Sequence, residues 1–247
     1  MLPMPDRVMV IGGRFNGPPG SGNGGYVCGL LGRDMGACAK VSLRYPPPLD
    51  IPLAVEDSGR GGLILHYLGR LIAEATPASR LSIAVPAPPD RAAARRAALA
   101  YPGFIDHPFA SCFACGPERA EGDGLRIFPG PLDGTDLVAA PWTPPPGLAS
   151  SGGLVADEFV WAALDCPGGW AASLQRQPGS VAVLGTLQVD IVHPIEVGRA
   201  YIATAWAVGN EGRKTFAASA LHSEEGAVCA LAMATWVELA SSASPTN

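Results

Sequence analysis

The alternation of apolar and polar positions describes the same unit twice, a helix followed by a run of strands. In the first half, apolar residues recur at helical spacing after Asn23, a residue type that caps helices well, and we expect a helix over residues 20–36. Shorter alternating segments separated by proline and glycine come next. They predict strands at Ala39–Tyr45, Leu53–Asp57, Gly62–Leu68, Leu71–Ala75 and Leu81–Val85.

The second half repeats this order more clearly. An apolar helix is predicted over residues 157–174, with a disturbance near Pro167. Asn-Glu-Gly and Glu-Glu-Gly tripeptides between the alternating segments after it are typical of hairpins. We expect strands at Val181–Val192, Ala200–Gly209, Lys214–Ser223 and Val228–Leu239.

A linker that begins at Pro86 separates the two units. It continues into a short Ala/Arg-rich helix at Asp90–Ala100, and we place the boundary near Tyr101. The expected N-terminal unit is residues 1–100 and the C-terminal unit is residues 101–247. Because the order of helix then strands occurs twice, we expect an α+β fold in which one antiparallel sheet wraps around two long central helices.

Composition and charge exclude several classes of protein. With 48% hydrophobic and 16% charged residues among 247, the chain can bury a core and is not disordered. A net charge of −5 without a basic cluster gives no reason to expect a nucleic-acid partner. The longest uncharged run, Leu137–Ala156, holds four prolines, so we expect a loop there and no membrane partner.

The same features bear on localisation. The first residues lack the basic region followed by an apolar region that marks a secretory signal. Six cysteines are too sparse for a disulfide scaffold and are expected to be reduced thiols. We therefore expect a soluble, cytoplasmic protein.

Several short segments resemble acyl-CoA thioesterases of the hotdog fold. Asn23-Gly24-Gly25-Tyr26, preceded by Phe15-Asn16-Gly17-Pro18, is similar to the start of their central helix, and Phe159–Asp165 is similar to the part that carries the acid. Leu187–Pro194 and Ala230–Glu238 resemble hotdog strands. Together these segments make nearly the whole chain similar to two fused hotdog units.

The resemblance implies a tandem (double) hotdog fold and an enzyme that hydrolyses acyl-CoA or an acyl-carrier thioester without a cofactor. The fused units already supply the pair that a single hotdog unit needs, so any oligomer is expected to consist of whole chains. We expect a homodimer.

The resemblance also implies where a site forms. In these thioesterases the N-terminal mouth of the helix and the acid are nine residues apart. Nine residues after Asn23 stands Gly32, and nine before Asp165 stands Ala156, so each unit keeps only half of a site. One complete site is expected between the units, with Asn23 and Asp165 as its catalytic residues. The expected substrate contacts are Gly24, Gly25, Tyr26 and Trp161.

Such a site combines two chemical groups. Free N–H groups at a helix N-terminus polarise a thioester carbonyl, and a carboxylate activates water or attacks directly. Two structural interpretations stay open, namely that Asp165 is an ordinary helix-end aspartate and that Asn23-Gly24-Gly25 is a plain helix cap. The alternative function is a non-catalytic acyl-thioester binding protein. A hotdog hydratase is disfavoured because the sequence has no closely spaced Asp–His pair near a helix mouth.

Cys112 and Cys115 form a Cys-x-x-Cys motif, but one pair does not make a zinc site. The other four cysteines are isolated in the sequence, and only His107, five residues before Cys112, leaves a Cys2His site open. The motif resembles a Cys-Phe-x-Cys-Gly segment of some hotdog thioesterases, which favours a structural role. We therefore predict no bound metal.

Overall fold

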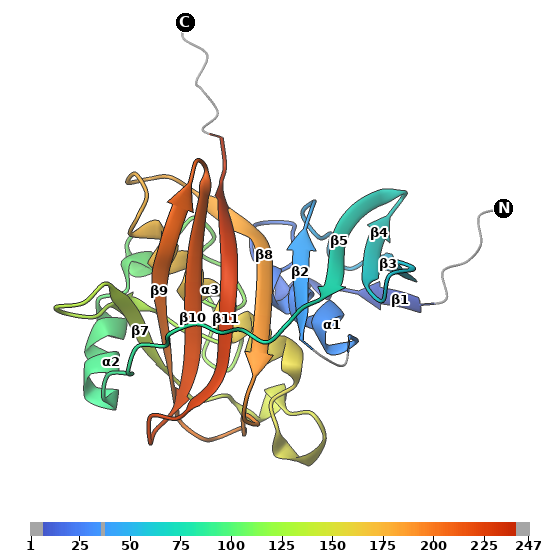
Figure 1. Ribbon diagram of the computed structural model, residues 1–247. Coiled ribbons are helices and arrows are strands. Elements are labelled where there is room, and N and C mark those ends of the chain that lie inside the picture. Colours follow the sequence, from blue (N-terminus) through green and yellow to red (C-terminus); the bar gives the residue numbers. More distant parts are fainter. Residues whose placement is uncertain (1–6, 36–37, 241–247) are drawn as a thin grey trace, which may run out of the picture.

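One continuous antiparallel sheet of eleven strands organises the computed structural model, which describes residues 7–35 and 38–240. In space the strands run in the order β1-β3-β4-β5-β2-β8-β11-β10-β9-β7-β6 (Figure 1). The two units join where β2 pairs with β8, with Val41 opposite Leu187. The strand bounds are β1 Arg7–Val10, β2 Ala39–Leu43, β3 Pro52–Asp57, β4 Leu63–Tyr67, β5 Arg70–Pro77, β6 Gly130–Pro131, β7 Leu137–Trp142, β8 Ala182–Ile191, β9 Tyr201–Glu211, β10 Lys214–Ser223 and β11 Val228–Glu238.

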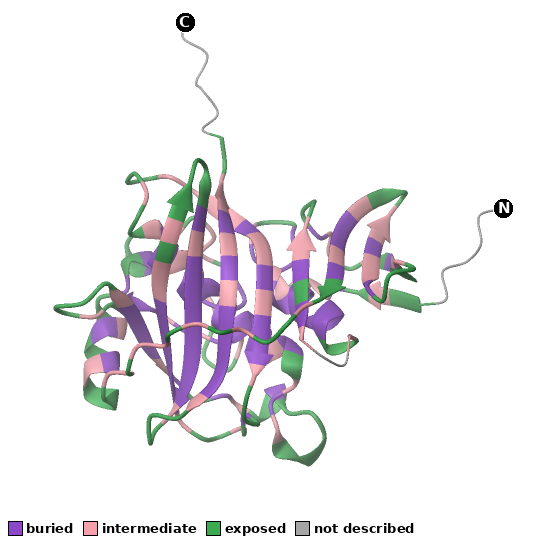
Figure 2. Ribbon diagram, viewed as in Figure 1, coloured by how far each residue is buried: buried purple, intermediate pink, exposed green. Residues whose placement is uncertain are grey.

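Two long helices lie on one face of this sheet (Figure 1). Helix α1 (Gly24–Arg33) packs against β2, β5 and β8, and helix α3 (Asp157–Ser173) packs against β7 to β11. The helices also pack against each other, and buried residues are concentrated on them and along the middle of the sheet (Figure 2). The predicted architecture of one antiparallel sheet around two central helices is confirmed.

Both helices are shorter than expected, α1 at both ends and α3 by one residue at its C-terminal end. Helix α1 begins at Gly24 rather than at residue 20, because Asn23 caps it and Gly20 has a φ of 72°, which a helix does not accommodate. Helix α1 ends at Arg33, with Asp34 as its C-cap, and residue 36, its expected last residue, lies outside the described residues. Helix α3 runs through Pro167 without ending, and the Ser219 hydroxyl donates to the Leu164 carbonyl (2.7 Å) in the turn before this proline.

A short helix connects the two units. Helix α2 (Arg91–Leu99) is capped by Asp90, whose side chain accepts from the Ala93 N–H at 2.7 Å. Although it precedes the expected boundary near Tyr101, α2 packs against β6 and β7 through a small alanine-rich cluster. The boundary itself stays a prediction.

The expected strand at Leu81–Val85 is wrong. This segment crosses in front of the sheet, on the face opposite the helices (Figure 1). Its residues alternate between half-buried and exposed because one side of the segment faces the sheet, but its backbone pairs with no strand. Side chains of β8 hold it there instead. The Leu81 N–H donates to the Asp190 carboxylate at 2.5 Å, and the Gln188 amide donates to the Ser79 carbonyl at 2.6 Å.

The uncharged run Leu137–Ala156 is a loop only in part, because its first residues form β7. Pro141 does not interrupt this strand. Strand β6 pairs only with Val138 and Ala139, so β7 is an edge strand at Pro141, where a missing N–H costs no ladder bond. Within residues 7–35 and 38–240, no helix has the length and apolar character needed to cross a bilayer.

The duplication extends to the turns that precede each long helix. The Gly22 N–H donates to the Pro47 carbonyl, and the Val155 N–H donates to the Ile195 carbonyl, both at 2.8 Å. Each helix therefore starts from a point that is hydrogen-bonded to the loop after the first strand that follows it, β2 for α1 and β8 for α3, so the two helix N-termini are held in equivalent ways.

The close packing of the helices predicts a difference between two helical glycines. A Cβ on Gly29 would lie 2.5 Å from the Glu158 Cα, whereas the nearest atom to a Cβ on Gly168 would lie 3.5 Å away. We expect Gly29→Ala to destabilise the fold by about 1–3 kcal/mol, as overpacking does, lowering Tm by about 2–4 °C for each kcal/mol. Gly168→Ala is the matched control and should leave Tm unchanged or raise it, because alanine favours a helix. Thermal unfolding followed by circular dichroism measures both variants, and equal Tm values would contradict the packing argument.

Candidate functional site

Asp165 of α3 lies against the first turn of α1. Its Oδ2 accepts a hydrogen bond from the Gly25 N–H at 2.8 Å and another from the Asn23 Nδ2 at 3.3 Å. A Cβ on Gly25 would lie only 2.4 Å from the Asp165 Cβ, so a side chain at position 25 would prevent this approach. The structure thus brings the helix mouth of one unit into contact with the acid of the other.

Asn23 has two roles in this arrangement. Its Oδ1 accepts from the Tyr26 N–H at 2.9 Å and so caps α1, as the sequence predicts. Its Nδ2 faces the Asp165 carboxylate and also the Cys112 Sγ, at 3.7 Å. The side chain is buried. The Asn23 amide therefore both caps the N-terminus of α1 and orients the Asp165 carboxylate.

The N–H of Gly24 remains available at the helix mouth. Asp165 accepts from the Gly25 N–H and Asn23 accepts from the Tyr26 N–H, whereas no acceptor within the described residues bonds to the Gly24 N–H. This donor lies at the positive end of the helix dipole, where an anion or a carbonyl oxygen is stabilised.

A cavity of about 990 Å³ opens onto these groups. Asn23, Gly24 and Asp165 lie in its wall. The cavity is large enough for a small-molecule substrate. Both units contribute the surrounding side chains, which are mainly apolar and include Leu43, Pro47, Trp170, Leu184 and Trp236. Asn23, Gly24 and Asp165 thus share one mainly apolar cavity wall, which also holds charged side chains such as Arg44 and Arg176.

Burial raises the pKa of Asp165 to about 7, and the hydrogen bonds from Gly25 and Asn23 oppose this rise. Its Oδ1 is buried and has no hydrogen-bond partner within the described residues. Because Oδ2 already accepts two hydrogen bonds, Oδ1 is the oxygen that can accept a proton.

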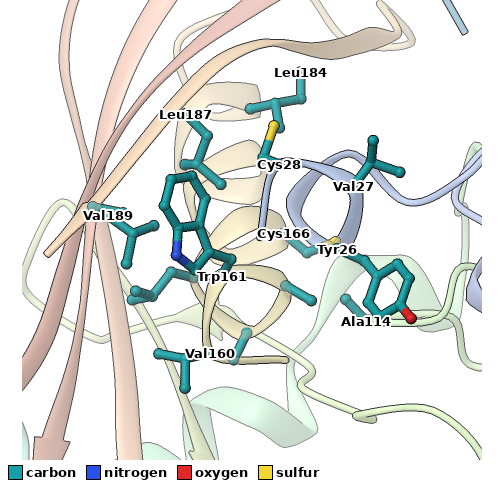
Figure 3. Packing of buried hydrophobic residues seen from close by; sticks show 14 of the residues in the cluster. Tyr26, Val27, Cys28, Ala114, Val160, Trp161, Cys166, Leu184, Leu187 and Val189 are labelled. Atoms are coloured by element: carbon teal, nitrogen blue, oxygen red, sulfur yellow. The ribbon is translucent and has the colours of Figure 1, made fainter. Parts of the chain in front are cut away.

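Two of the expected substrate contacts lie elsewhere. Tyr26 and Trp161 are buried in the core and not on the cavity wall, and Gly25 reaches the site only through its N–H. Figure 3 shows Trp161 beside Leu187 and Val189, while Tyr26 points toward the other side of α1. The Tyr26 ring stacks on Phe15, with ring centroids 4.1 Å apart. Both side chains therefore pack around the helices that position the site.

The equivalent position in the other half holds no comparable arrangement. Helix α3 begins after Ala156, which offers no side-chain cap, and Glu158 in its first turn pairs with Arg33 at 2.6 Å. At Gly32, where an acid would stand, a Cβ would lie 2.5 Å from the Trp161 indole. No carboxylate fits there without displacing Trp161.

The site borders a group of cysteines that the sequence did not reveal. The sulfurs of Cys112, Cys115 and Cys166 lie within 4.8 Å of one another, and all three residues line the cavity. Cys166 follows Asp165 directly in α3, whereas the other two lie in the loop between α2 and β6. Hydrogen bonds from the Cys115 and Cys166 thiols hold the pKa of Cys112 well below its usual range. Spacing along the chain could not predict this group, because the fold brings Cys166 to the other two.

No model of a known protein family and no curated protein matches the chain. Solved structures do resemble it. The tesB protein of Mycobacterium avium subsp. paratuberculosis is 10% identical, with a TM-score of 0.60 over 89% of this chain and 88% of that one. A conserved protein of unknown function with a hot dog fold from Alicyclobacillus acidocaldarius is 12% identical, with a TM-score of 0.58 over 94% of this chain and 92% of that one. Both likenesses therefore span both units.

Comparison with the Asp90 cap of α2 allows the contribution of Asn23 to stability to be measured. Asn23→Ala and Asp90→Ala each remove a side chain that accepts from a first-turn N–H, a change that typically costs about 1 kcal/mol. We expect Asn23→Ala to cost more than Asp90→Ala, because it also leaves the buried Asp165 carboxyl with one hydrogen bond fewer. Urea unfolding of both variants measures the difference, and a smaller loss for Asn23→Ala would contradict the shared role.

Proposed function

The chain is a protein of the double hotdog fold, and we propose that it is a thioesterase that hydrolyses acyl-CoA or another acyl thioester at one site between its units. The observation that carries this proposal is the hydrogen bond from the Gly25 N–H of α1 to Asp165, beside the free Gly24 N–H, at the wall of a large cavity. A carboxylate beside a free helix N–H supplies the base and the oxyanion donor that thioester hydrolysis can use.

The substrate carbonyl is placed by the helix mouth. The Gly24 N–H donates to the carbonyl oxygen of the thioester, and the helix dipole stabilises the negative charge that develops on this oxygen. The apolar cavity wall takes up the acyl chain, because burying methylene groups is favourable.

Asp165 acts on the attacking water. With Oδ2 fixed by Gly25 and Asn23, Oδ1 takes a proton from a water molecule as the water oxygen bonds to the carbonyl carbon. The carbon–sulfur bond then breaks, and the proton passes from Asp165 to the leaving sulfur. The products are a carboxylic acid and a free thiol, and Asp165 returns to its starting state.

A non-catalytic acyl-thioester binding protein is the alternative, and the same cavity would serve it. A panel of acyl-CoAs of increasing chain length separates the two functions. Release of free thiol from at least one of them is expected for the thioesterase. Binding of the acyl-CoAs without thiol release from any of them would favour the binding protein.

The sharpest test of the catalytic role is Asp165→Asn. The amide keeps the shape of the carboxyl group but cannot accept the proton, so we expect kcat to fall by about 10²–10⁴-fold. Binding of a non-hydrolysable thioether analogue should stay nearly unchanged, as measured by calorimetry.

Asp157→Asn is the matched control for this substitution. Asp157 lies in the first turn of the same helix and not on the cavity wall, so this variant should keep wild-type kcat. If Asp165→Asn also keeps wild-type kcat, or loses activity only because it unfolds, Asp165 is a structural aspartate and the site assignment is wrong.

Asn23→Ala should slow turnover less than Asp165→Asn does. The Gly24 N–H still reaches the carbonyl oxygen, so the loss should stay below the about 10²–10³-fold that removal of an oxyanion donor costs. Asp90→Ala removes an equivalent cap far from the cavity and serves as the control, with kcat unchanged. A loss of kcat in Asn23→Ala that equals or exceeds the loss in Asp165→Asn would contradict this order of roles.

A further inference from the structure

Three cysteine thiols converge at the edge of the cavity without forming a disulfide. The Sγ atoms of Cys112 and Cys166 are 3.7 Å apart, and the Cys115 Sγ lies within 4.8 Å of both. All three residues are buried, and their thiols are free. Two elements distant in sequence, a loop and the middle of α3, therefore present three soft ligand atoms to one point.

The sulfur separations fit one metal ion. In a tetrahedral site with zinc–sulfur bonds of about 2.3 Å, neighbouring sulfurs lie about 3.8 Å apart, close to the Cys112–Cys166 separation. A [4Fe–4S] cluster binds each cysteine to a different iron and so holds the sulfurs farther apart, and a [2Fe–2S] cluster takes four protein ligands rather than three. Thiolate ligands select zinc over magnesium or calcium.

The loop that carries Cys112 and Cys115 is built to hold both sulfurs on one side. The Gly116 N–H donates to the Cys112 carbonyl at 2.8 Å, which closes the loop. A Cβ on Gly116 would lie 2.5 Å from the Cys112 nitrogen, so only glycine permits a turn this tight. The Tyr101 hydroxyl donates to the Cys115 carbonyl at 3.0 Å and fixes the loop from behind.

Neighbouring donors suit sulfurs that carry negative charge. His107 Nδ1 accepts from the Phe109 N–H at 2.8 Å, so its Nε2 carries the proton and faces the Cys115 Sγ at 3.3 Å. The Asn23 Nδ2 faces the Cys112 Sγ. His107 is thus placed to donate a hydrogen bond to the Cys115 sulfur rather than to act as a ligand, and such donors commonly surround metal ligands.

We propose that Cys112, Cys115 and Cys166 bind one Zn²⁺ ion as thiolates. Binding releases the protons of the three thiols, and the fourth ligand is a water from the cavity that all three cysteines line. The ion ties the Cys112–Cys115 loop to α3 at the residue next to Asp165, and so fixes the cavity wall where the carboxyl group lies. The Cys-x-x-Cys pair is completed by a third ligand from a distant part of the chain.

Metal analysis of the purified full-length chain tests the proposal. Protein produced with added Zn²⁺ under reducing conditions should hold about one zinc per chain. Replacing zinc with Co²⁺ should give a sulfur-to-cobalt charge-transfer absorption band. A chain without zinc and without this band overturns the proposal, as does a mass lower by two hydrogens that shows a disulfide among these three cysteines.

Cysteine variants identify the ligands. Cys112→Ser and Cys166→Ser should each reduce zinc to below about one tenth of the wild-type content, because a single remaining pair binds weakly. The controls are Cys38→Ser and Cys229→Ser, which remove cysteines outside the group and should keep about one zinc per chain. Circular dichroism confirms that each variant is folded. Full zinc content in folded Cys166→Ser overturns the proposal, and the wild-type measurements stand whether or not the variants fold. None of these readouts depends on thioesterase activity.

Discussion

The close crossing of α1 and α3 is the constraint on which the candidate site depends. Three glycines, Gly25, Gly29 and Gly32, lie at helical spacing on α1, and an added Cβ at any of them would overlap α3. Because these positions carry no side chains, the backbones of the two helices can pack closely against each other beneath the sheet. Asp165 can then reach the Gly25 N–H across the seam between the units. Any longer side chain on this face of α1 would separate the acid from the helix mouth.

The two halves of the chain carry complementary parts of the candidate site. The N-terminal unit keeps the capped helix mouth and has Gly32 at the acid position, whereas the C-terminal unit keeps Asp165 and starts its helix after Ala156. Burying a carboxyl group with one oxygen unpartnered costs the fold about 1–3 kcal/mol. Buried carboxyl groups with a perturbed pKa that line a cavity are candidates for functional groups. At the equivalent position beside Gly32, the space that an acid would need is occupied by the Trp161 side chain, which packs between the helices.

Much of this could be predicted from the sequence, because it depends on local pattern. The two central helices and most strands follow from apolar spacing. The nine-residue offset pointed to Asn23 and Asp165, which lie within hydrogen-bond distance, and their catalytic roles stay a prediction. Contacts between distant segments could not be predicted in this way. Leu81–Val85 has a strand pattern but no neighbour to pair with, and β7 contains a proline that only its edge position tolerates. The meeting of Cys166 with Cys112 and Cys115 depends on the fold alone.

The central claim is that the two halves form one site per chain and not two. Calorimetric titration of a non-hydrolysable acyl-CoA thioether into the full-length protein measures this number directly. One molecule bound per chain, with binding lost when the cavity is blocked by Gly24→Trp but retained in Asp165→Asn, is the predicted result. Two equivalent molecules per chain, or one whose binding Gly24→Trp leaves unchanged, would contradict the assignment of the site to the mouth of α1 and Asp165.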